Sequence, residues 1–168
     1  MKLVITGSPA VGRTSLCLRV ADFCMQNGLK VGGMVSKEAS SGLEVCDFES
    51  GTSGLFLRNE VSGIAIGHDF SVLESIGVTA IGNAAAYCDV VLIDGVCEAQ
   101  MRSKEFRQIC YSAFGSGKHV IVSADERFAG TFAKIADFSI DISKQGVQKC
   151  YERALSICGD KLKDRPLD

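Results

Sequence analysis

Short apolar runs recur along the chain, and stretches with helical periodicity separate them. Runs of this length and composition are typical of strands that are buried on both faces of a parallel sheet. The expected strands cover residues 2–6, 29–36, 90–93, 119–123 and 138–142. The expected helices cover residues 13–27, 70–86, 101–114 and 144–158, with a shorter helix before residue 138. This alternation predicts an α/β fold, in which helices flank both faces of a mostly parallel sheet.

Residues 37–67 break this alternation. They are rich in Gly and Ser, and their apolar residues fall in short segments at 43–46, 54–57 and 63–66. A period of two between turn residues is typical of antiparallel strands or hairpins. The stretch is too short for a core of its own, so we expect a small antiparallel insertion that packs beside the main sheet. The chain then forms one domain over residues 1–158, and a polar tail at 159–168 is expected to fray.

The apolar run at residues 3–5 leads into a glycine-rich turn, Gly7–Thr14, and a helical pattern follows immediately. The turn matches the phosphate-binding pattern G-x-x-x-x-G-K-[ST] with one departure, because Arg13 stands where the pattern has lysine. Strand, turn and helix is also the order that such a loop requires. A plain glycine-rich turn is the alternative, but spacing, position and flanks all favour a phosphate loop. We call residues Gly7–Thr14 the phosphate loop.

The residue types in the phosphate loop suit the phosphates of a nucleotide. Gly7 and Gly12 can adopt backbone angles closed to other residues, so that successive N–H groups point into one concavity. The N-terminus of the following helix adds partial positive charge. Arg13 is expected to contact the β- and γ-phosphate oxygens, and the Thr14 hydroxyl to ligate Mg²⁺. The candidate nucleotide-binding residues are Gly7, Ser8, Pro9, Ala10, Val11, Gly12, Arg13, Thr14 and Ser15.

The apolar run at residues 90–93 indicates a second half of the same site, because it ends in Asp94. In P-loop enzymes a buried strand ending in aspartate is the Walker B motif. We expect this strand to lie beside the strand that precedes the phosphate loop, with Asp94 at the carboxyl edge of the sheet, where ligands bind. Asp94 can there hold Mg²⁺ through a water while Thr14 holds it directly. The alternative is that Asp94 only caps the next turn.

Two further patterns carry less weight. Gly115–Lys118 looks like a fragment of a phosphate loop, but it follows a helix and precedes a strand, so a helix C-terminal turn is favoured. His68 and His119 have no nucleophile paired with them in the sequence. Surface or strand-edge roles are therefore favoured over catalysis.

Composition narrows the class of function. The net charge of −2 gives no basic footprint for nucleic acid, and no apolar run is long enough to span a bilayer. Met1 leads directly into the first strand, which leaves no room for a cleaved signal peptide. The eight cysteines include no C-x-x-C pair. We interpret them as reduced, buried residues of a cytoplasmic protein rather than metal ligands or disulfides.

Four motifs, in order and with their spacing, resemble one family. They are Thr6–Leu16 (TGSPAVGRTSL), Val31–Glu38 (VGGMVSKE), Ile93–Cys97 (IDGVC) and Ser103–Phe106 (SKEF). Over nearly all of residues 1–158 the chain is similar to the small P-loop nucleoside-triphosphatases of thermophilic bacteria and archaea, which have a human cancer-related counterpart. The resemblance implies a P-loop fold and slow, Mg²⁺-dependent hydrolysis of the terminal phosphate of ATP, GTP and related nucleotides.

The chain departs from the family pattern at several charged or glycine positions. Arg13 replaces the loop lysine, Ala10 replaces a loop glycine, and Gly95 replaces the glutamate expected to orient the attacking water. Further departures are Asp125-Glu126 in place of His-Arg, with Arg127 next, and Ser40 in place of an arginine. Arginine keeps the charge of lysine but is planar and bulkier. Losing a general base costs roughly 10²–10⁴-fold in rate, so turnover should suffer more than binding.

The resulting hypothesis is a nucleoside-triphosphatase that takes ATP or GTP as its partner and Mg²⁺ as its cofactor. Its catalytic candidates are Arg13, Asp94 and Glu38, with Glu98 as a second possible substitute for the missing carboxylate, and its metal ligands are Thr14 and Asp94. One alternative is a catalytically degenerate relative that acts as a switch or scaffold, and another is a small-molecule kinase. If the active site is otherwise sound, Arg13→Lys with Gly95→Glu should raise turnover. No pattern indicates the preferred base or the oligomeric state.

Overall fold

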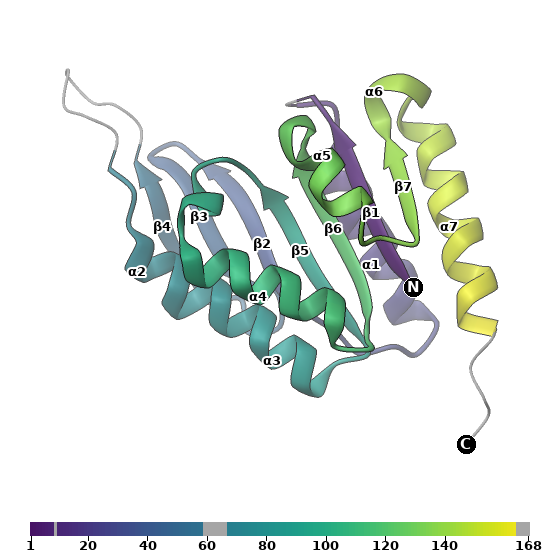
Figure 1. Ribbon diagram of the computed structural model, residues 1–168, viewed down its shortest axis with the longest axis horizontal. Helices are drawn as coiled ribbons and strands as arrows, with labels where there is room; N and C mark the ends of the chain where they lie inside the picture. Colours follow the sequence, from purple (N-terminus) through teal and green to yellow (C-terminus); the bar gives the residue numbers. More distant parts are fainter. Residues whose placement is uncertain (9, 59–66, 164–168) are drawn as a thin grey trace.

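The computed structural model describes residues 1–8, 10–58 and 67–163 (Figure 1). The strands are β1 (Lys2–Gly7), β2 (Val31–Ala39), β3 (Gly42–Asp47), β4 (Ser53–Arg58), β5 (Val90–Val96), β6 (His119–Asp125) and β7 (Phe138–Asp141). The α-helices are α1 (Arg13–Gln26), α2 (Phe70–Val72), α3 (Thr79–Tyr87), α4 (Lys104–Gly115), α5 (Glu126–Ala133), α6 (Ile142–Gln145) and α7 (Val147–Lys163). A π-helix covers Leu73–Val78 and a 3₁₀ turn covers Gln100–Arg102.

The strands form one seven-stranded sheet in the order β4-β3-β2-β5-β6-β1-β7. β2, β5, β6, β1 and β7 run parallel, whereas β3 and β4 pair antiparallel at one edge. The predicted α/β fold is confirmed. The expectation that the strand ending in Asp94 lies beside the strand of the phosphate loop is wrong, because β6 pairs with both β1 and β5 and separates them. The C-terminal residues of β6 therefore lie between the two nucleotide motifs.

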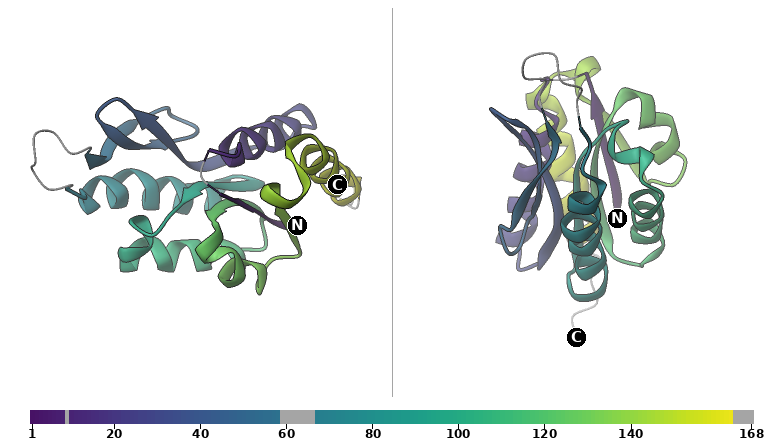
Figure 2. Two further views of the ribbon diagram at one scale, coloured as in Figure 1. Left: turned by 90° about the horizontal axis from the view of Figure 1, so that it is seen from above. Right: turned by 90° about the vertical axis from the view of Figure 1, so that its left-hand side faces the viewer.

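Both faces of the central sheet are covered, as the continuous apolar runs predict. Successive residues of β1 point to opposite faces, so Val4 belongs to one core cluster while Leu3 and Ile5 belong to the other. Helices α1 and α7 pack on one face, and α3, α4 and α5 on the other (Figure 2). Because the parallel strands all end at the same edge, this arrangement brings their following loops together.

The insertion packs as an extension of the main sheet. β3 pairs with β2, and β4 pairs with β3, with a register shift between Leu43 and Glu44. Two of the three expected segments, 43–46 and 54–57, are therefore antiparallel strands. The third, at 63–66, lies outside the described residues. Because β3 and β4 contribute buried side chains such as Val45 and Phe56 to the same core, the insertion shares the core of the main sheet.

The helices differ from those expected from the sequence at several boundaries. The helix expected at 101–114 begins at Lys104, after the 3₁₀ turn. The stretch expected as one helix at 70–86 contains a π-helix, where a Cβ on Gly77 would lie 2.8 Å from Met34 Sδ, so the Met34 side chain packs directly on the helix backbone. The expected helix at 144–158 is divided at Gly146, which has φ of 77°. α7 continues to Lys163, so the first residues of the expected tail are helical.

The cysteines are free, and seven of the eight are buried, which agrees with their interpretation as small apolar residues. Cys97 is partly exposed. Among the described residues, no helix has the length and apolar character needed to cross a membrane.

Candidate functional site

The phosphate loop joins the carboxyl end of β1 to α1, as predicted. Gly12 has φ of 98°, in the left-handed region that favours glycine, and its carbonyl accepts the Leu16 amide at 2.9 Å. Among the described residues, no side chain caps the N-terminus of α1. The first amide groups of the helix therefore lack a side-chain acceptor, which is the arrangement in which a helix N-terminus binds an anion.

Ala10 is the single non-glycine residue with a positive φ in the described part of the chain. Its φ of 61° lies in the left-handed region, which costs an L-residue roughly 1–2 kcal/mol. The family pattern that the sequence resembles has glycine at this position. The loop therefore retains a glycine-type conformation although it carries a side chain there, and it holds local strain.

A pocket of about 550 Å³ lies against the phosphate loop and the end of β2. Its lining residues are Ala10, Gly12, Arg13, Thr14, Ser15, Ser36, Lys37 and Glu38. The loop side supplies amide groups, two hydroxyls and a guanidinium, and the β2 side supplies a hydroxyl, a carboxylate and an ammonium. Glu38 thus lines the same pocket as Arg13 and Thr14, although these residues are distant in the sequence.

Asp94 lies at the carboxyl end of β5 and is completely buried. Its Oδ1 accepts a hydrogen bond from the Ser123 hydroxyl, and the Ser123 oxygen in turn accepts the Gly95 amide at 2.8 Å. Its Oδ2 is buried and has no hydrogen-bond partner among the described residues. Nearly all buried polar atoms in folded proteins are partnered, so the unpaired Oδ2 indicates a position where a ligand atom, water or cation completes the site.

The surroundings of Asp94 disfavour its charged form. Burial raises the pKa of the Asp94 carboxyl above its ordinary value, whereas the nearby hydroxyls of Ser123 and Thr14 and the charge of Arg13 oppose that shift. The raised pKa means that the folded protein is less stable when the carboxyl at this position is charged. A cation beside Oδ2 would offset that cost.

A second set of hydrogen bonds holds the backbone of the Asp94 segment. The Ser36 hydroxyl donates to the Asp94 carbonyl at 3.0 Å, and the buried Gln100 Nε2 donates to Ser36 Oγ at 2.9 Å. The Gln100 Oε1 accepts the Cys97 amide at 3.0 Å. β2 and the turn after β5 are thereby tied together directly beneath the pocket.

Gly95 adopts φ of 83°, so this position itself requires glycine-type geometry. A Cβ at Gly95 would lie 2.7 Å from Ser36 Cβ. The β5–β6 register shifts between Ile93 and Val96, which accommodates the unusual backbone. The missing glutamate is therefore accompanied by a backbone that leaves no space for a side chain.

Arg13 makes an ion pair with Asp125, the last residue of β6. Arg13 Nη1 lies 2.6 Å from Asp125 Oδ1, and the two side chains are 15% and 29% exposed. Arg13 Nη1 is nevertheless buried without an aligned hydrogen bond among the described residues. The contact at Nη1 is thus a close charge pair without an aligned hydrogen bond.

Ser143 at the start of α6 holds the first part of the loop. Its Oγ accepts the Ser8 amide at 2.9 Å and lies 3.0 Å from Ser8 Oγ. It also lies 3.3 Å from Glu126 Oε1, to which it donates. The Ser8 amide is therefore already engaged in this conformation.

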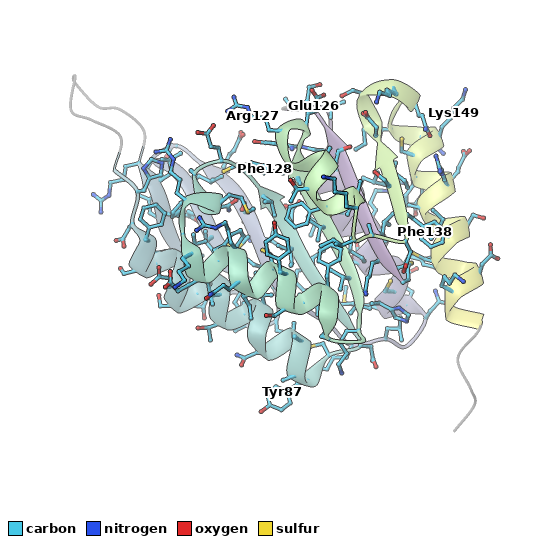
Figure 3. The ribbon with its side chains drawn as sticks, in the orientation of Figure 1. Tyr87, Glu126, Arg127, Phe128, Phe138 and Lys149 are labelled. Atoms are coloured by element: carbon cyan, nitrogen blue, oxygen red, sulfur yellow. The ribbon has the colours of Figure 1, made fainter. Side chains whose placement is uncertain are left out.

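The two carboxylates considered as substitutes for the missing glutamate occupy different surroundings. Glu38 lines the pocket. Glu98 instead pairs with Arg127, and with Arg102 at 3.3 Å. Figure 3 places Arg127 beside Glu126 at the edge where β1 and β6 end. Glu38 is thus the candidate that faces the phosphate loop.

The structure brings most of the predicted site residues to one edge of the sheet, with Arg13, Thr14 and Glu38 on the pocket and Asp94 buried near Arg13 and Thr14. Pro9 lies outside the described residues. Sequence reasoning missed Ser36, Ser123 and Asp125 as parts of the site. The sequence did contain signals for them. Ser36 lies within the VGGMVSKE motif, and Ser123 and Asp125 end an apolar run as Asp94 does.

Known proteins share this fold. A curated relative, the nucleoside-triphosphatase THEP1 of Methanothermobacter thermautotrophicus, is 29% identical over 171 aligned residues, covering 95% of this chain and 97% of the relative. The crystal structure of THEP1 from Aquifex aeolicus has a TM-score of 0.73 at 20% identity and covers 94% of this chain and 98% of its own. The solution structure of a human cancer-related nucleoside triphosphatase has a TM-score of 0.74 at 18% identity, with 98% and 99% covered.

A protein-family model described as NTPase matches residues 2–147, which include the phosphate loop, Glu38, Asp94 and Asp125. The match extends over most of the chain and over every strand of the sheet. The chain therefore belongs to the NTPase family.

Proposed function

We propose that this chain hydrolyses nucleoside triphosphates such as ATP or GTP to the diphosphate and inorganic phosphate, with Mg²⁺ as cofactor. The observation that carries the proposal is a pocket lined by both the phosphate loop and Glu38, with Asp94 buried close to the loop and one of its oxygens unpaired. Family membership and the names of the curated relatives support the same reaction.

The phosphate loop is proposed to bind the triphosphate through amide groups at the start of α1 and through Arg13. Positioning and charge neutralisation dominate phosphoryl transfer, so these groups act mainly by holding the γ-phosphate in place. The guanidinium of Arg13 can bind two phosphate oxygens in a fork. Pro9 and Val11 remain expected members of the same loop.

The residues present fit a magnesium ion. Asp94 Oδ2 is an orphaned buried oxygen, and the Thr14 hydroxyl lies close enough to lower the pKa of that carboxyl. A carboxylate and a hydroxyl, completed by water and phosphate oxygens, are ligands that Mg²⁺ prefers. The described residues hold no cluster of three or more His, Cys, Asp or Glu that would suit another metal. When bound, the ion would neutralise charge on the β- and γ-phosphates.

Glu38 is proposed to orient the attacking water. It is the carboxylate that the pocket presents opposite Arg13 and Thr14. Position 95 cannot contribute, because it is glycine in a conformation that leaves no room for a side chain. We therefore expect a slow enzyme, in which a carboxylate from β2 replaces the one that usually follows the Walker B aspartate.

A second candidate is a nucleotide-binding protein that does not turn over its ligand. Two observations favour it: the side-chain-free position 95, and the charge of Arg13, which is already paired with Asp125. Such a protein would retain the loop amides and act as a switch or scaffold.

Single-turnover phosphate release, with enzyme in excess over radiolabelled ATP or GTP and with Mg²⁺, separates the two candidates. Wild type should release phosphate, Asp94→Ala should not, and Glu38→Gln should bind nucleotide but release phosphate at least tenfold more slowly. Glu44→Gln on β3, outside the pocket, is the matched control and should behave as wild type. Binding without release by wild type would favour the scaffold, and absence of binding would contradict both candidates.

We also propose a cytoplasmic location. The eight free thiols, seven of them buried in the core, suit a reducing compartment. Thiol titration of the denatured protein, isolated under alkylating conditions, should find all eight reactive.

A further inference from the structure

The positive charge of Arg13 in the phosphate loop is already paired with a carboxylate, that of Asp125. Arg13 Nη1 lies 2.6 Å from Asp125 Oδ1, and the Cα partner of Asp125 across the β1–β6 pairing is Gly7, the first residue of the loop. Asp125 is thus held by the sheet itself, directly beside the loop. The guanidinium of Arg13, in contrast, lies at the end of a side chain with several rotatable bonds.

The two partners face different spaces. Arg13 lines the 550 Å³ pocket, whereas Asp125 lines a smaller cavity of about 150 Å³ together with Gly7, Glu126 and Arg127. The ion pair therefore draws the end of Arg13 toward the tip of β6. An anion in the larger pocket must either attract Arg13 away from Asp125 or bind beside the Asp125 carboxylate.

The geometry of the pair makes it displaceable. Arg13 Nη1 is buried but makes no aligned hydrogen bond within the described chain, so the pair gains Coulomb energy without the directional bonds of a bidentate contact. Asp125 is partly exposed, and partly exposed ion pairs contribute little to stability. A triphosphate offers the same guanidinium more charge and more acceptor oxygens.

The other charges nearby do not replace Arg13. Lys37 lines the pocket from β2 next to Glu38, and Arg127 is paired with Glu98. Asp94 and Glu126 add two more carboxylates close to the loop. Arg13 is thus the cation of the loop itself, and whether it is available to phosphate depends on Asp125.

We propose that Asp125 is the residue that sets the affinity of the site for phosphate, because it competes with the nucleotide phosphates for Arg13. In the nucleotide-free protein the pair holds the loop in a charge-neutral, low-affinity state. Binding exchanges Asp125 for phosphate oxygens on the guanidinium. This inference rests on the proposed function only in assuming that the phosphates bind in the loop pocket.

The test compares full-length wild type with Asp125→Asn by titration with a fluorescent ATP analogue and Mg²⁺, and with inorganic tripolyphosphate as competitor. Asp125→Asn should bind both probes about three- to tenfold more tightly, since one weak ion pair and one repulsive charge are removed. KM should fall while kcat does not rise. Asp125→Glu, which keeps the charge, should restore affinity close to that of wild type.

Two controls separate competition for Arg13 from a general effect of charge. Glu126→Gln removes a carboxylate one residue away and should tighten binding clearly less. In an Arg13→Ala background, Asp125→Asn should give no more than a small gain. Without nucleotide, the Arg13 Nε–H NMR signal should shift in Asp125→Asn, and tripolyphosphate should shift it in wild type.

Equal or weaker binding by a folded Asp125→Asn protein would overturn the inference while leaving the proposed function intact. A gain that persists without Arg13, or one matched by Glu126→Gln, would overturn it as well. Failure of wild type and all variants to bind either probe would instead contradict the proposed function, and the inference with it.

Discussion

Gly95 and Ser36 approach so closely that a Cβ on Gly95 would lie 2.7 Å from Ser36 Cβ and 2.8 Å from its Oγ. The same Ser36 hydroxyl donates to the Asp94 carbonyl, so the contact and the hydrogen bond fix one geometry together. The glycine that follows the Walker B aspartate is therefore part of how β2 and β5 meet. It cannot be exchanged for glutamate without moving β2, which also carries Glu38.

Gly95→Glu should destabilise the protein and should not raise turnover. A left-handed non-glycine residue costs roughly 1–2 kcal/mol and overpacking against Ser36 adds about 1–3 kcal/mol, so we expect a loss of about 2–5 kcal/mol. Urea unfolding measures it. Ser36→Gly should not recover the loss, because it removes the overlapping atoms together with the hydroxyl that bonds the Asp94 carbonyl and Gln100. A single variant as stable as wild type would show that this backbone can relax. The gain in turnover expected from the sequence therefore does not follow for this substitution.

Ser123→Ala should weaken both the fold and the metal site. Removing the hydroxyl leaves Asp94 Oδ1 without its donor and the Gly95 amide without its acceptor, and such buried orphans cost about 1–3 kcal/mol each. The loss of the donor should also raise the pKa of Asp94 further and lower Mg²⁺ affinity in a nucleotide-binding titration. Ser139→Ala, an exposed serine on β7, is the control and should change neither. Unchanged stability in Ser123→Ala would mean that water replaces the hydroxyl.

Asp94→Asn should stabilise the nucleotide-free protein near neutral pH while abolishing activity. Because burial raises the folded-state pKa of Asp94 above its ordinary value, the folded state binds more protons than the unfolded state between those two values. The stability of wild type therefore falls as pH rises through that window, starting near pH 3.9. Asp94→Asn lacks this pH-dependent loss of stability. Its stability advantage over wild type should therefore be smallest below pH 4 and constant above the window, where it should reach roughly 1 kcal/mol, or about 2–4 °C in Tm.

Thermal melts of the two proteins across pH 3–8, without nucleotide, measure this difference. Comparing variants cancels the carboxyls whose pKa values are lowered, such as Asp69 and Asp141. Mg²⁺ with a nonhydrolysable ATP analogue should stabilise wild type more than Asp94→Asn. An advantage of Asp94→Asn that vanishes toward neutral pH would contradict a raised Asp94 pKa.

The sequence predicts the elements of this fold well because β1, β5 and β6 are buried on both faces. Each of these strands then needs an uninterrupted apolar run, and the helices between them need one apolar stripe. The order of the strands within the sheet cannot be predicted in this way. The runs of β1, β5 and β6 are chemically alike, so nothing local states that β6 lies between the other two.

The residues of the site fall into the same two groups, those that the local sequence predicts and those that depend on the order of the strands. The phosphate loop and Asp94 are contiguous motifs whose chemistry can be read locally. Ser123 and Asp125 join the site only through the position of β6, which is a long-range property. The close contact at Gly95 could not be foreseen when a glutamate there was expected to raise turnover, since the contact comes from a residue on another strand.

Ala10→Gly should stabilise the protein, against the usual effect of this substitution. Ala10 has φ of 61° and carries the strain of a left-handed L-residue, roughly 1–2 kcal/mol, whereas glycine adds entropy to the unfolded chain worth about 0.4–1 kcal/mol. The net expectation is a gain of about 0.5–1 kcal/mol in urea unfolding. Ala129→Gly in α5 is the matched control and should lose about 1 kcal/mol, because its helical backbone gains nothing from glycine. Nucleotide affinity should not fall in Ala10→Gly, since the change removes a methyl group from the pocket and keeps every amide of the loop. If Ala10→Gly is destabilised as Ala129→Gly is, then Ala10 is not strained, and its replacement of glycine needs no compensation from the rest of the loop.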